Sequence, residues 1–366
     1  MANVVLVFVT GPTCGRQCVV ARFTRQQMMD MGLLPPPNLP SDQTEEQSHT
    51  ANGAEVAGEE ILVGAVQDAS RASGSGEHGQ TEEEDQEEEE TPDPIGLIGH
   101  FEARALLGHK DTPGSFVGSL DMSMTERDLI STQDGVALPP TGDAEPCLVV
   151  SWSELGVMVK KAKKGQYGCW ELYGDTKTSP YKVSGISEST SRPAMLCAPL
   201  RAPGPPTMVL GGFAMHRISG GDQKSTIEPG LDTEHKVTAS GARWANGRVL
   251  DTCTGLGYTA IAAARCRGVS SVVTVELDEV ALRMCTHNPW SREMFESDKI
   301  TSLEGDCCEL VKGFADGEFA VVIHDPPARA LCKTTDMYGA AFYKDLARVL
   351  KPGGSLFHYI GNPASK

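Results

Sequence analysis

Four acidic side chains stand where strands are expected to end, and together they could bind a nucleotide-like cofactor. Asp251 follows the short run RVL, and Glu276 and Asp306 follow two later apolar runs. Asp325 ends the run FAVVIH and is followed by two prolines. Open α/β sheets bind ligands at the carboxyl ends of their parallel strands, so we expect the four carboxylates to line one site.

A glycine turn follows the first of these acids. The segment GLGYTA that begins at Gly255 fits the pattern GxGxxA, and Glu276 lies 21 residues after that glycine, as in dinucleotide sites. A pyrophosphate beside Asp251 would meet a repelling carboxylate, whereas S-adenosylmethionine (SAM) has no phosphate and carries an ammonium and a sulfonium. We therefore predict a SAM site in which Glu276 binds the ribose hydroxyls and Asp306 the adenine amine. Gly255 and Gly257 would let the backbone approach the cofactor closely.

The turn Asp325-Pro326-Pro327 indicates the reaction. Two prolines donate no N–H, so the turn offers only acceptors, namely the carboxylate of Asp325 and backbone carbonyls such as that of Pro326. These acceptors would hold the N–H groups of an amine, aim its lone pair at the methyl group, and stabilise the positive charge that grows on nitrogen. We predict methyl transfer to an amine, with these three residues as the catalytic turn. His324 could relay a proton, or it could be structural.

From Gly241 onward, strands and helices alternate. We expect strands at 248–253, 271–277, 299–305, 319–325 and 355–361, with helices at 257–266, 279–286 and 339–350. Alternation of this kind predicts right-handed crossovers and a mostly parallel sheet with helices on both faces.

Residues 241–361 resemble a class I SAM-dependent methyltransferase. In more detail, most of residues 98–366 resemble a family of predicted methyltransferases that is widespread in archaea. The shared segments are DTCTGLGYTAI, VELD, HNPWS, IHDPP and FYKDLARVLKPGGSLFHYIGNP, with SFVGSLDMS, VSWSEL and GGFAMHRI upstream. The resemblance implies a Rossmann-like fold and the use of SAM, and it implies no substrate. It implies a cofactor site at Asp251, Thr252, Gly255, Gly257, Glu276 and Asp306. It also implies a cap over the methionine end at Met215, His216, Arg217, Asp232, Thr233 and Lys236.

The chain departs from the class I pattern in two places. Ala328 follows the prolines where base-modifying enzymes often carry a stacking aromatic, which weakens a base-specific interpretation; Arg329 could meet a phosphate or carboxylate. The sequence also stops shortly after the fifth expected strand, where a class I sheet normally has two more. The sheet would then lack its last two strands and leave SLFHYI as an exposed edge. Either strands from 1–34 and 96–150 cover this edge, or the chain is truncated, and we favour truncation.

Upstream of the sheet the chain divides into three segments. We expect residues 1–34 to form a strand and helix or a transit-like segment, and 96–240 to form a small α+β module that precedes the SAM-binding domain of 241–366. We expect an acidic, disordered insert at 35–95. Residues 41–95 carry 17 acidic residues and one basic residue, and so account for −16 of the net charge of −17. The remaining chain is near neutral and has no gross basic surface that would indicate nucleic acid.

The composition argues against several classes of protein. The eleven cysteines have neither a disulfide framework nor zinc spacing, so we expect reduced thiols and no metal. No apolar run is long enough to cross a membrane. We expect a cytoplasmic or nuclear protein, with import into an organelle as a further possibility.

The methyl acceptor stays open between RNA, protein and a metabolite, with a macromolecule such as RNA weakly favoured. The run Lys160–Lys164, followed by Tyr167, Trp170 and Tyr173, could track a nucleic-acid backbone, although a solvated helix end is the plainer interpretation. Alternative functions are aminopropyl transfer from decarboxylated SAM, non-catalytic SAM binding and, least favoured, a dehydrogenase.

Overall fold

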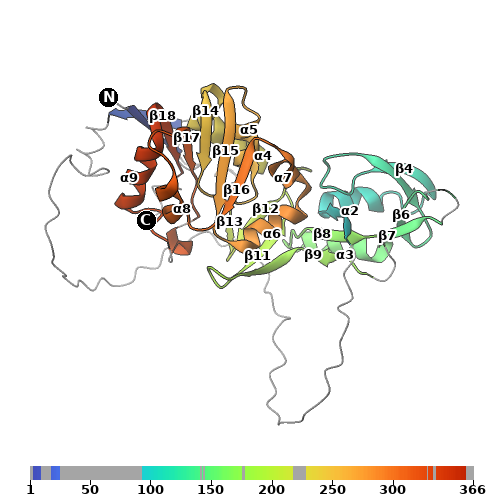
Figure 1. Cartoon of the computed structure of the whole chain (residues 1–366). Helices are drawn as coiled ribbons and strands as arrows, with labels where there is room; N and C mark the ends of the chain where they lie inside the picture. The colour runs from blue at the N-terminus through green and yellow to red at the C-terminus, as the bar shows by residue number, and fades with distance from the viewer. Residues whose placement is uncertain are drawn as a thin grey trace, which may run out of the picture. The chain divides into compact units, whose positions relative to one another are not determined.

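The computed structural model describes most of the chain beyond residue 92 and two strands before it (Figure 1). The described residues are 3–9, 18–24, 93–140, 142, 145–174, 178–216, 228–327, 329–332 and 335–359, and the first two ranges are described by backbone pairing alone. Most of the predicted transit-like segment and of the acidic insert lies outside these residues, as do Arg217 and Ala328. The described residues fall into two compact units, one formed by 93–121 and 125–182 and the other by the rest.

The larger unit is built on a seven-stranded sheet in the order β16-β15-β14-β17-β18-β1-β2. The strands are β16 (Ile300–Glu304), β15 (Val269–Glu276), β14 (Gly247–Asp251), β17 (Phe319–His324), β18 (Leu350–His358), β1 (Asn3–Val9) and β2 (Cys18–Thr24). Neighbouring strands from β16 to β1 are parallel, and β2 runs antiparallel to β1. The predicted Rossmann-like parallel sheet is thus confirmed, with bounds within two residues for the first four strands, whereas β18 begins five residues before the start expected at 355.

The two strands at the N-terminus occupy the edge that the sequence was expected to leave bare. β1 pairs in parallel with β18, from Val5 beside Ser355 to Phe8 beside His358, and β2 pairs with β1 (Figure 1). The expectation of a sheet without its last two strands is therefore corrected, since strands from residues 1–34 fill both positions. The physical reason is that β18 would otherwise present unpaired N–H and C=O groups, and the β-branched run NVVLVFV is typical of a strand that can pair with them.

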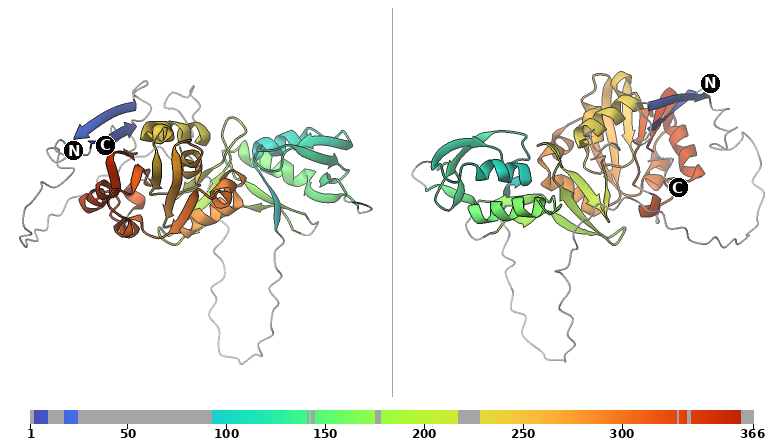
Figure 2. Two further views of the ribbon diagram at one scale, coloured as in Figure 1. Left: turned by 45° about the horizontal axis from the view of Figure 1, so that its top comes forward. Right: turned by 180° about the vertical axis from the view of Figure 1, so that it is seen from behind.

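Helices cover both faces of this sheet, as predicted (Figure 2). On one face α4 (Pro229–Ser240) and α5 (Tyr258–Ala264) share a core with residues such as Val249 and Phe357. On the other face α8 (Cys307–Leu310) and α9 (Ala340–Val349) share a core with Leu250 and Val322. Alternate residues of β14 enter opposite cores, because side chains alternate along a strand. The remaining helices of this unit are α6 (Glu279–His287), α7 (Arg292–Glu296) and four 3-10 turns at Ala242–Trp244, Pro289–Ser291, Val311–Gly313 and Arg329–Leu331.

A small antiparallel sheet belongs to the same unit. Its order is β10 (Ser184–Ser187), β11 (Arg192–Cys197), β12 (Thr207–Leu210) and β13 (Phe213–Ala214). The hydroxyls of Ser187 and Ser189 donate to Asp278 Oδ2 at 2.5 and 3.0 Å, which ties this sheet to the start of α6. The expected module of residues 96–240 is therefore divided between the two units.

The smaller unit has its own core and two antiparallel sheets. One sheet consists of β3 (Pro94–Ile98), β8 (Trp170–Tyr173) and β9 (Tyr181–Lys182). The other consists of β4 (Gly114–Gly118), β5 (Arg127–Ser131), β6 (Gly135–Leu138) and β7 (Cys147–Ser151). The unit also contains the helices α2 (His100–Leu107) and α3 (Trp152–Ala162). Trp170 and Tyr173 are buried, so their rings are not presented for base stacking. The plainer interpretation of Lys160–Lys164, a solvated helix end, fits this arrangement better.

Among the described residues, every helix is too short or too polar to cross a lipid bilayer.

Candidate active site

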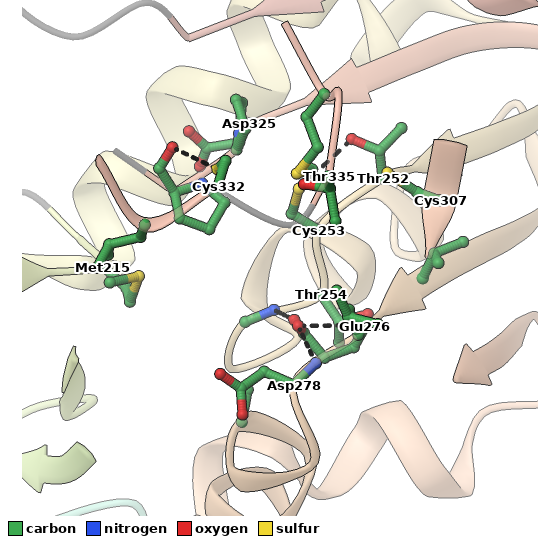
Figure 3. A pocket seen from close by; sticks show the side chains of 18 of the residues that line it. Met215, Thr252, Cys253, Thr254, Glu276, Asp278, Cys307, Asp325, Cys332 and Thr335 are labelled. Atoms are coloured by element: carbon green, nitrogen blue, oxygen red, sulfur yellow. Dashed lines mark hydrogen bonds between the residues drawn. The ribbon is translucent and has the colours of Figure 1, made fainter. Parts of the chain in front are cut away.

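A cavity of about 800 Å³ lies at the carboxyl ends of the parallel strands of the larger unit (Figure 3). Its floor is formed by 252–255, 275–278, 305–307 and 325–327, which follow or end β14, β15, β16 and β17. One wall comes from the small sheet and the residues after it, up to His216, and another from 335–343 and 356–359. This size and position are typical of a small-molecule or cofactor site.

Glu276, at the end of β15, is held by three backbone amides. Its Oε2 accepts from the N–H of Gly255 at 2.8 Å, and its Oε1 accepts from the N–H groups of Leu277 and Asp278 at 3.0 Å each. Burial nevertheless raises the pKa of Glu276 to about 7, against the effect of these amides. The carboxylate lines the cavity at the predicted ribose position, in a fixed orientation.

The two predicted glycines have different roles. Gly255 has φ +53°, and a Cβ built there meets nothing within 4 Å, so its exposed side faces free space in the cavity. Gly257 has φ +74°, and a Cβ there would lie 2.5 Å from Met294 Sδ. Close packing against α7 therefore accounts for Gly257, while Gly255 leaves room for a ligand.

Asp251 and Thr252 sit deeper, at the end of β14. Asp251 is fully buried and lies behind the cavity wall; its Oδ2 accepts from the Thr274 hydroxyl at 3.0 Å, and its Oδ1 has no partner among the described residues. Burial raises the pKa of Asp251 to about 8. Thr252 lines the cavity, and its hydroxyl lies 2.7 Å from His324 Nδ1. Direct contact of Asp251 with a cofactor stays a prediction.

Asp306 lies at the far end of the floor, after β16. Its Oδ1 accepts from the N–H of Cys308 at 2.8 Å and so caps α8. Asp306, Cys307 and Cys308 each offer one atom that could bind a metal ion, and these atoms lie within 4.8 Å of one another. The spacing of these residues in the sequence is not one of the usual zinc-binding patterns. Asp306 and Cys307 line the cavity, which is compatible with the predicted adenine position.

The predicted catalytic turn, Asp325-Pro326-Pro327, is in contact with a buried lysine. Lys236, from α4, lies 2.6 Å from Asp325 Oδ2 and 2.8 Å from Asp232 Oδ2, and is itself buried (Asp325 is labelled in Figure 3). Burial alone would lower the pKa of Lys236, but the two carboxylates raise it, so the amine stays charged. Burial raises the pKa of Asp325, and Lys236 opposes that shift. One oxygen of the predicted catalytic carboxylate is therefore already committed to an ion pair.

The two proline carbonyls differ. The Tyr338 hydroxyl donates to the carbonyl of Pro327 at 2.7 Å. Within the described part of the chain, no group donates to the carbonyl of Pro326, which lines the cavity. The acceptor expected for an incoming amine is thus available at Pro326.

The structure brings together some of the residues that were predicted to cap the methionine end of the cofactor. Met215 and His216 line the cavity, and His216 Nδ1 lies 2.9 Å from the Thr207 hydroxyl. Lys236 reaches Asp325 of the predicted catalytic turn, and Asp232 contacts Lys236. Thr233, by contrast, is buried with its hydroxyl donating to the carbonyl of Pro229 in α4, which is a structural contact.

Sequence reasoning missed the aromatic wall opposite the small sheet. Tyr338, Tyr343, His358 and Tyr359 line the cavity from α9, the end of β18 and the residues beside them. Three of these, Tyr343, His358 and Tyr359, fall inside the segment FYKDLARVLKPGGSLFHYIGNP, so the resemblance marked the segment without indicating that it faces the site.

Comparison with known proteins agrees with this geometry. Residues 234–363 match the family model of the methyltransferase small domain. An uncharacterized protein of Methanocaldococcus jannaschii is 44% identical over 162 residues, which are 44% of this chain and 52% of that protein. The sheet and its site are therefore similar to a class I methyltransferase domain.

A second set of similarities is with aminopropyltransferases. Polyamine aminopropyltransferase 2 of Streptomyces coelicolor is 27% identical over 153 residues, covering 40% of this chain and 26% of that protein. The crystal structure of spermidine synthase from Thermotoga maritima has a TM-score of 0.34 at 15% identity, over 46% of this chain and 53% of that one. The chain spans about half or less of the length of these curated relatives.

Proposed function

We propose that the protein is a SAM-dependent methyltransferase that acts on an amine nitrogen. One observation carries the proposal: a carboxylate fixed by three backbone amides, Glu276, and an acceptor-only turn, Asp325-Pro326-Pro327, line the same cavity. The carboxylate can accept hydrogen bonds from the hydroxyls of an adenosyl group, and the turn can accept them from the N–H groups of an amine.

The residues at the donor end fit SAM. Glu276 would accept from the ribose hydroxyls, Asp306 from the adenine amine, and the free side of Gly255 would admit the ligand against the backbone. Burial raises the pKa of both Asp251 and Glu276, and within the described residues neither carboxylate has a cation paired with it. A donor with a sulfonium and an ammonium supplies a positive charge.

The acceptor end would orient the nucleophile. SAM supplies a methyl carbon on a sulfonium, so that a nitrogen–carbon bond forms as the sulfur–carbon bond breaks and sulfur keeps the electron pair. The carbonyl of Pro326 would accept an N–H of the amine, and the oxygen of Asp325 that Lys236 does not hold would accept another. Lys236 fixes the Asp325 side chain, and positioning of this kind is the main contribution such a turn can make.

The test is to identify the transferred group. The purified protein is incubated with SAM or with decarboxylated SAM and fractions of RNA, protein and metabolites, and products are detected by mass spectrometry. We expect a methyl increment with SAM, reduced at least about 100-fold in Asp325→Asn, since positioned electrostatic groups contribute on this order. Failure of the wild-type protein to transfer methyl to any fraction while it binds SAM would support non-catalytic SAM binding instead.

Aminopropyl transfer is the second candidate. The similarity to polyamine aminopropyltransferase 2 favours it, as does the charge at the turn, where the two carboxylates of Asp232 and Asp325 share one lysine and leave one net negative charge. An aminopropyl increment on putrescine, seen with decarboxylated SAM and absent with SAM, would establish this function and reject the methyltransferase.

A further inference from the structure

Three consecutive residues at the predicted adenine end of the cavity form a group of potential metal ligands. Asp306 follows β16, and Cys307 and Cys308 begin α8. A carboxylate oxygen and two thiol sulfurs of these residues lie within 4.8 Å of one another. In a tetrahedral zinc site with bonds of about 2.0–2.3 Å, the ligand atoms lie about 3.3–3.8 Å apart. Small side-chain rotations would therefore close this group around one ion.

The carboxylate of Asp306 is already oriented for such a role. Its Oδ1 accepts from the N–H of Cys308 at 2.8 Å, and among the described residues no group donates to its Oδ2. A contact of this kind fixes the direction in which a metal ligand points. Asp306 and Cys307 both line the cavity, so an ion can reach the group from the same space that a donor would enter.

Two further thiols lie beside this group. The hydrogen bond to Cys308 and burial raise the pKa of Cys307, and Cys253 adds to that shift. Burial raises the pKa of Cys332 to about 11, and Cys308 adds to that shift. Cys253 and Cys332 also line the cavity, and both are labelled with Cys307 in Figure 3. The segments that follow β14, β16 and β17 therefore bring four thiols near one another.

The chemistry of these ligands selects the class of ion. Sulfur ligands favour borderline and soft cations such as Zn²⁺, whereas Mg²⁺ and Ca²⁺ take six or more ligands that are mainly oxygens. Two thiolates and one carboxylate, with a water or a third thiolate in the fourth position, fit tetrahedral Zn²⁺. The same set supplies too few oxygens for a hard cation.

We propose that Asp306, Cys307 and Cys308 form a site for a thiophilic divalent cation of the Zn²⁺ class, and that this ion and the adenosyl donor exclude each other. The exclusion follows because Asp306 is also the predicted acceptor for the adenine amine, and one carboxylate oxygen cannot serve both. The exclusion rests on the proposed function, whereas the metal site does not depend on it. Binding requires reduced thiols, whose protons pass to the solvent as the thiolates form.

The first test measures metal binding by the full chain, kept reduced with a phosphine. Co²⁺ is the probe, because thiolate ligands give this ion a charge-transfer absorption band that reports the metal–sulfur bonds directly. We expect the band to appear with Co²⁺, to disappear when Zn²⁺ displaces it, and to be unaffected by Mg²⁺.

Serine variants identify the ligands. Cys307→Ser combined with Cys308→Ser should lose most of the band and weaken Zn²⁺ binding about 100-fold or more, since a structural zinc site gains several kcal/mol from each ligand. The matched control combines Cys147→Ser and Cys266→Ser, two half-buried thiols that do not line the cavity, and should keep the band. Asp306→Asn keeps an oxygen for the helix cap and should weaken Zn²⁺ binding about ten-fold, which separates loss of a ligand from misfolding.

The second test measures exclusion by calorimetry with S-adenosylhomocysteine (SAH). When free Zn²⁺ is present at ten times its Kd, mutually exclusive binding lowers the apparent SAH affinity about ten-fold. We expect this loss in the wild type and in the control variant. The variant that lacks both Cys307 and Cys308 should show the same SAH affinity with and without Zn²⁺.

Two results would overturn the proposal. One is that the wild type and the variant lacking Cys307 and Cys308 bind Co²⁺ and Zn²⁺ alike. The other is that SAH binds equally well with and without saturating Zn²⁺, although the ion is held by these cysteines. A chain that binds no SAH, but whose Zn²⁺ affinity still depends on Cys307 and Cys308, would instead reject the donor site and keep the metal site.

Discussion

The two ends of the cavity differ in how their polar groups are held. At the donor end, Glu276 accepts three backbone N–H groups, and Asp306 is tied to the N-terminus of α8. At the acceptor end, no group among the described residues donates to the carbonyl of Pro326, and Asp325 depends on one side chain, Lys236.

This difference matches the demands of the two ligands. The donor is the same molecule in every turnover, so it can be bound by groups that the backbone already holds in place. An acceptor is recognised by groups that stay unsatisfied until it binds, because an unpaired buried group rejects ligands that cannot pair with it. Side-chain changes at the donor end should therefore weaken binding of the donor. At the acceptor end, groups without partners should lower the stability of the protein while they increase its selectivity for the acceptor.

The largest effect on stability is expected at Lys236, the one residue on which Asp325 at the acceptor end depends. Lys236→Met leaves the buried carboxylate of Asp232 and the partly buried carboxylate of Asp325 without their counter-ion, and we expect a loss of ~3–5 kcal/mol in the free energy of unfolding. Urea denaturation measures it. Adding Asp232→Asn to this variant removes one of the two unpaired charges and should restore part of the loss; a double variant no more stable than the single one would contradict the shared ion pair.

The two glycines of the turn separate packing from ligand access. Gly257→Ala places a Cβ against Met294 at a positive φ, so we expect a loss of ~1–3 kcal/mol in stability by thermal unfolding. Gly255→Ala meets free space, and we expect a cost of only ~1 kcal/mol with a larger loss of SAH affinity. Equal SAH affinities for Gly255→Ala and the wild type would mean that the ligand does not approach this face of the turn.

A change of one pH unit is expected to have a smaller effect. Burial raises the pKa of Asp251 from 3.8 to about 8, so the folded protein binds a proton that the unfolded chain has released. Between about pH 4 and pH 8 the unliganded protein should therefore lose stability as pH rises, by up to ~1.4 kcal/mol per pH unit for one group. Asp251→Asn should flatten this slope in thermal unfolding measured from pH 5 to pH 8, and an unchanged slope would contradict the assignment.

The same acids predict how donor affinity depends on pH. A bound sulfonium favours the ionised forms of Asp251 and Glu276, so SAM binding releases protons and its affinity should increase severalfold between pH 6 and pH 8. SAH lacks the sulfonium charge and should show a weaker dependence. Calorimetry in buffers of different ionisation enthalpy would detect the released protons.

Much of the donor end could be predicted from sequence because its information is local. The turn after Asp251, the spacing to Glu276 and the acids at strand ends follow from strand–turn–helix patterns. The acceptor end could not be predicted in the same way, since Lys236 reaches Asp325 from a helix 89 positions earlier and His358 faces the cavity only through the register of β17 with β18. The same holds for β1, which reaches β18 from the other end of the chain.

The most direct test of the account is isothermal titration calorimetry of the full chain with SAH, comparing the wild type with Glu276→Gln. The glutamine has one oxygen for three backbone donors and turns an amide toward them, so we predict measurable binding by the wild type and a loss of about 100-fold or more in the variant. Thermal unfolding measured in parallel should show that the variant is folded at the titration temperature, with a loss of ~1–3 kcal/mol in stability. A folded wild-type protein that gives no heat with either SAH or SAM, or equal affinities for the two proteins, would contradict the assignment of this cavity to an adenosyl donor.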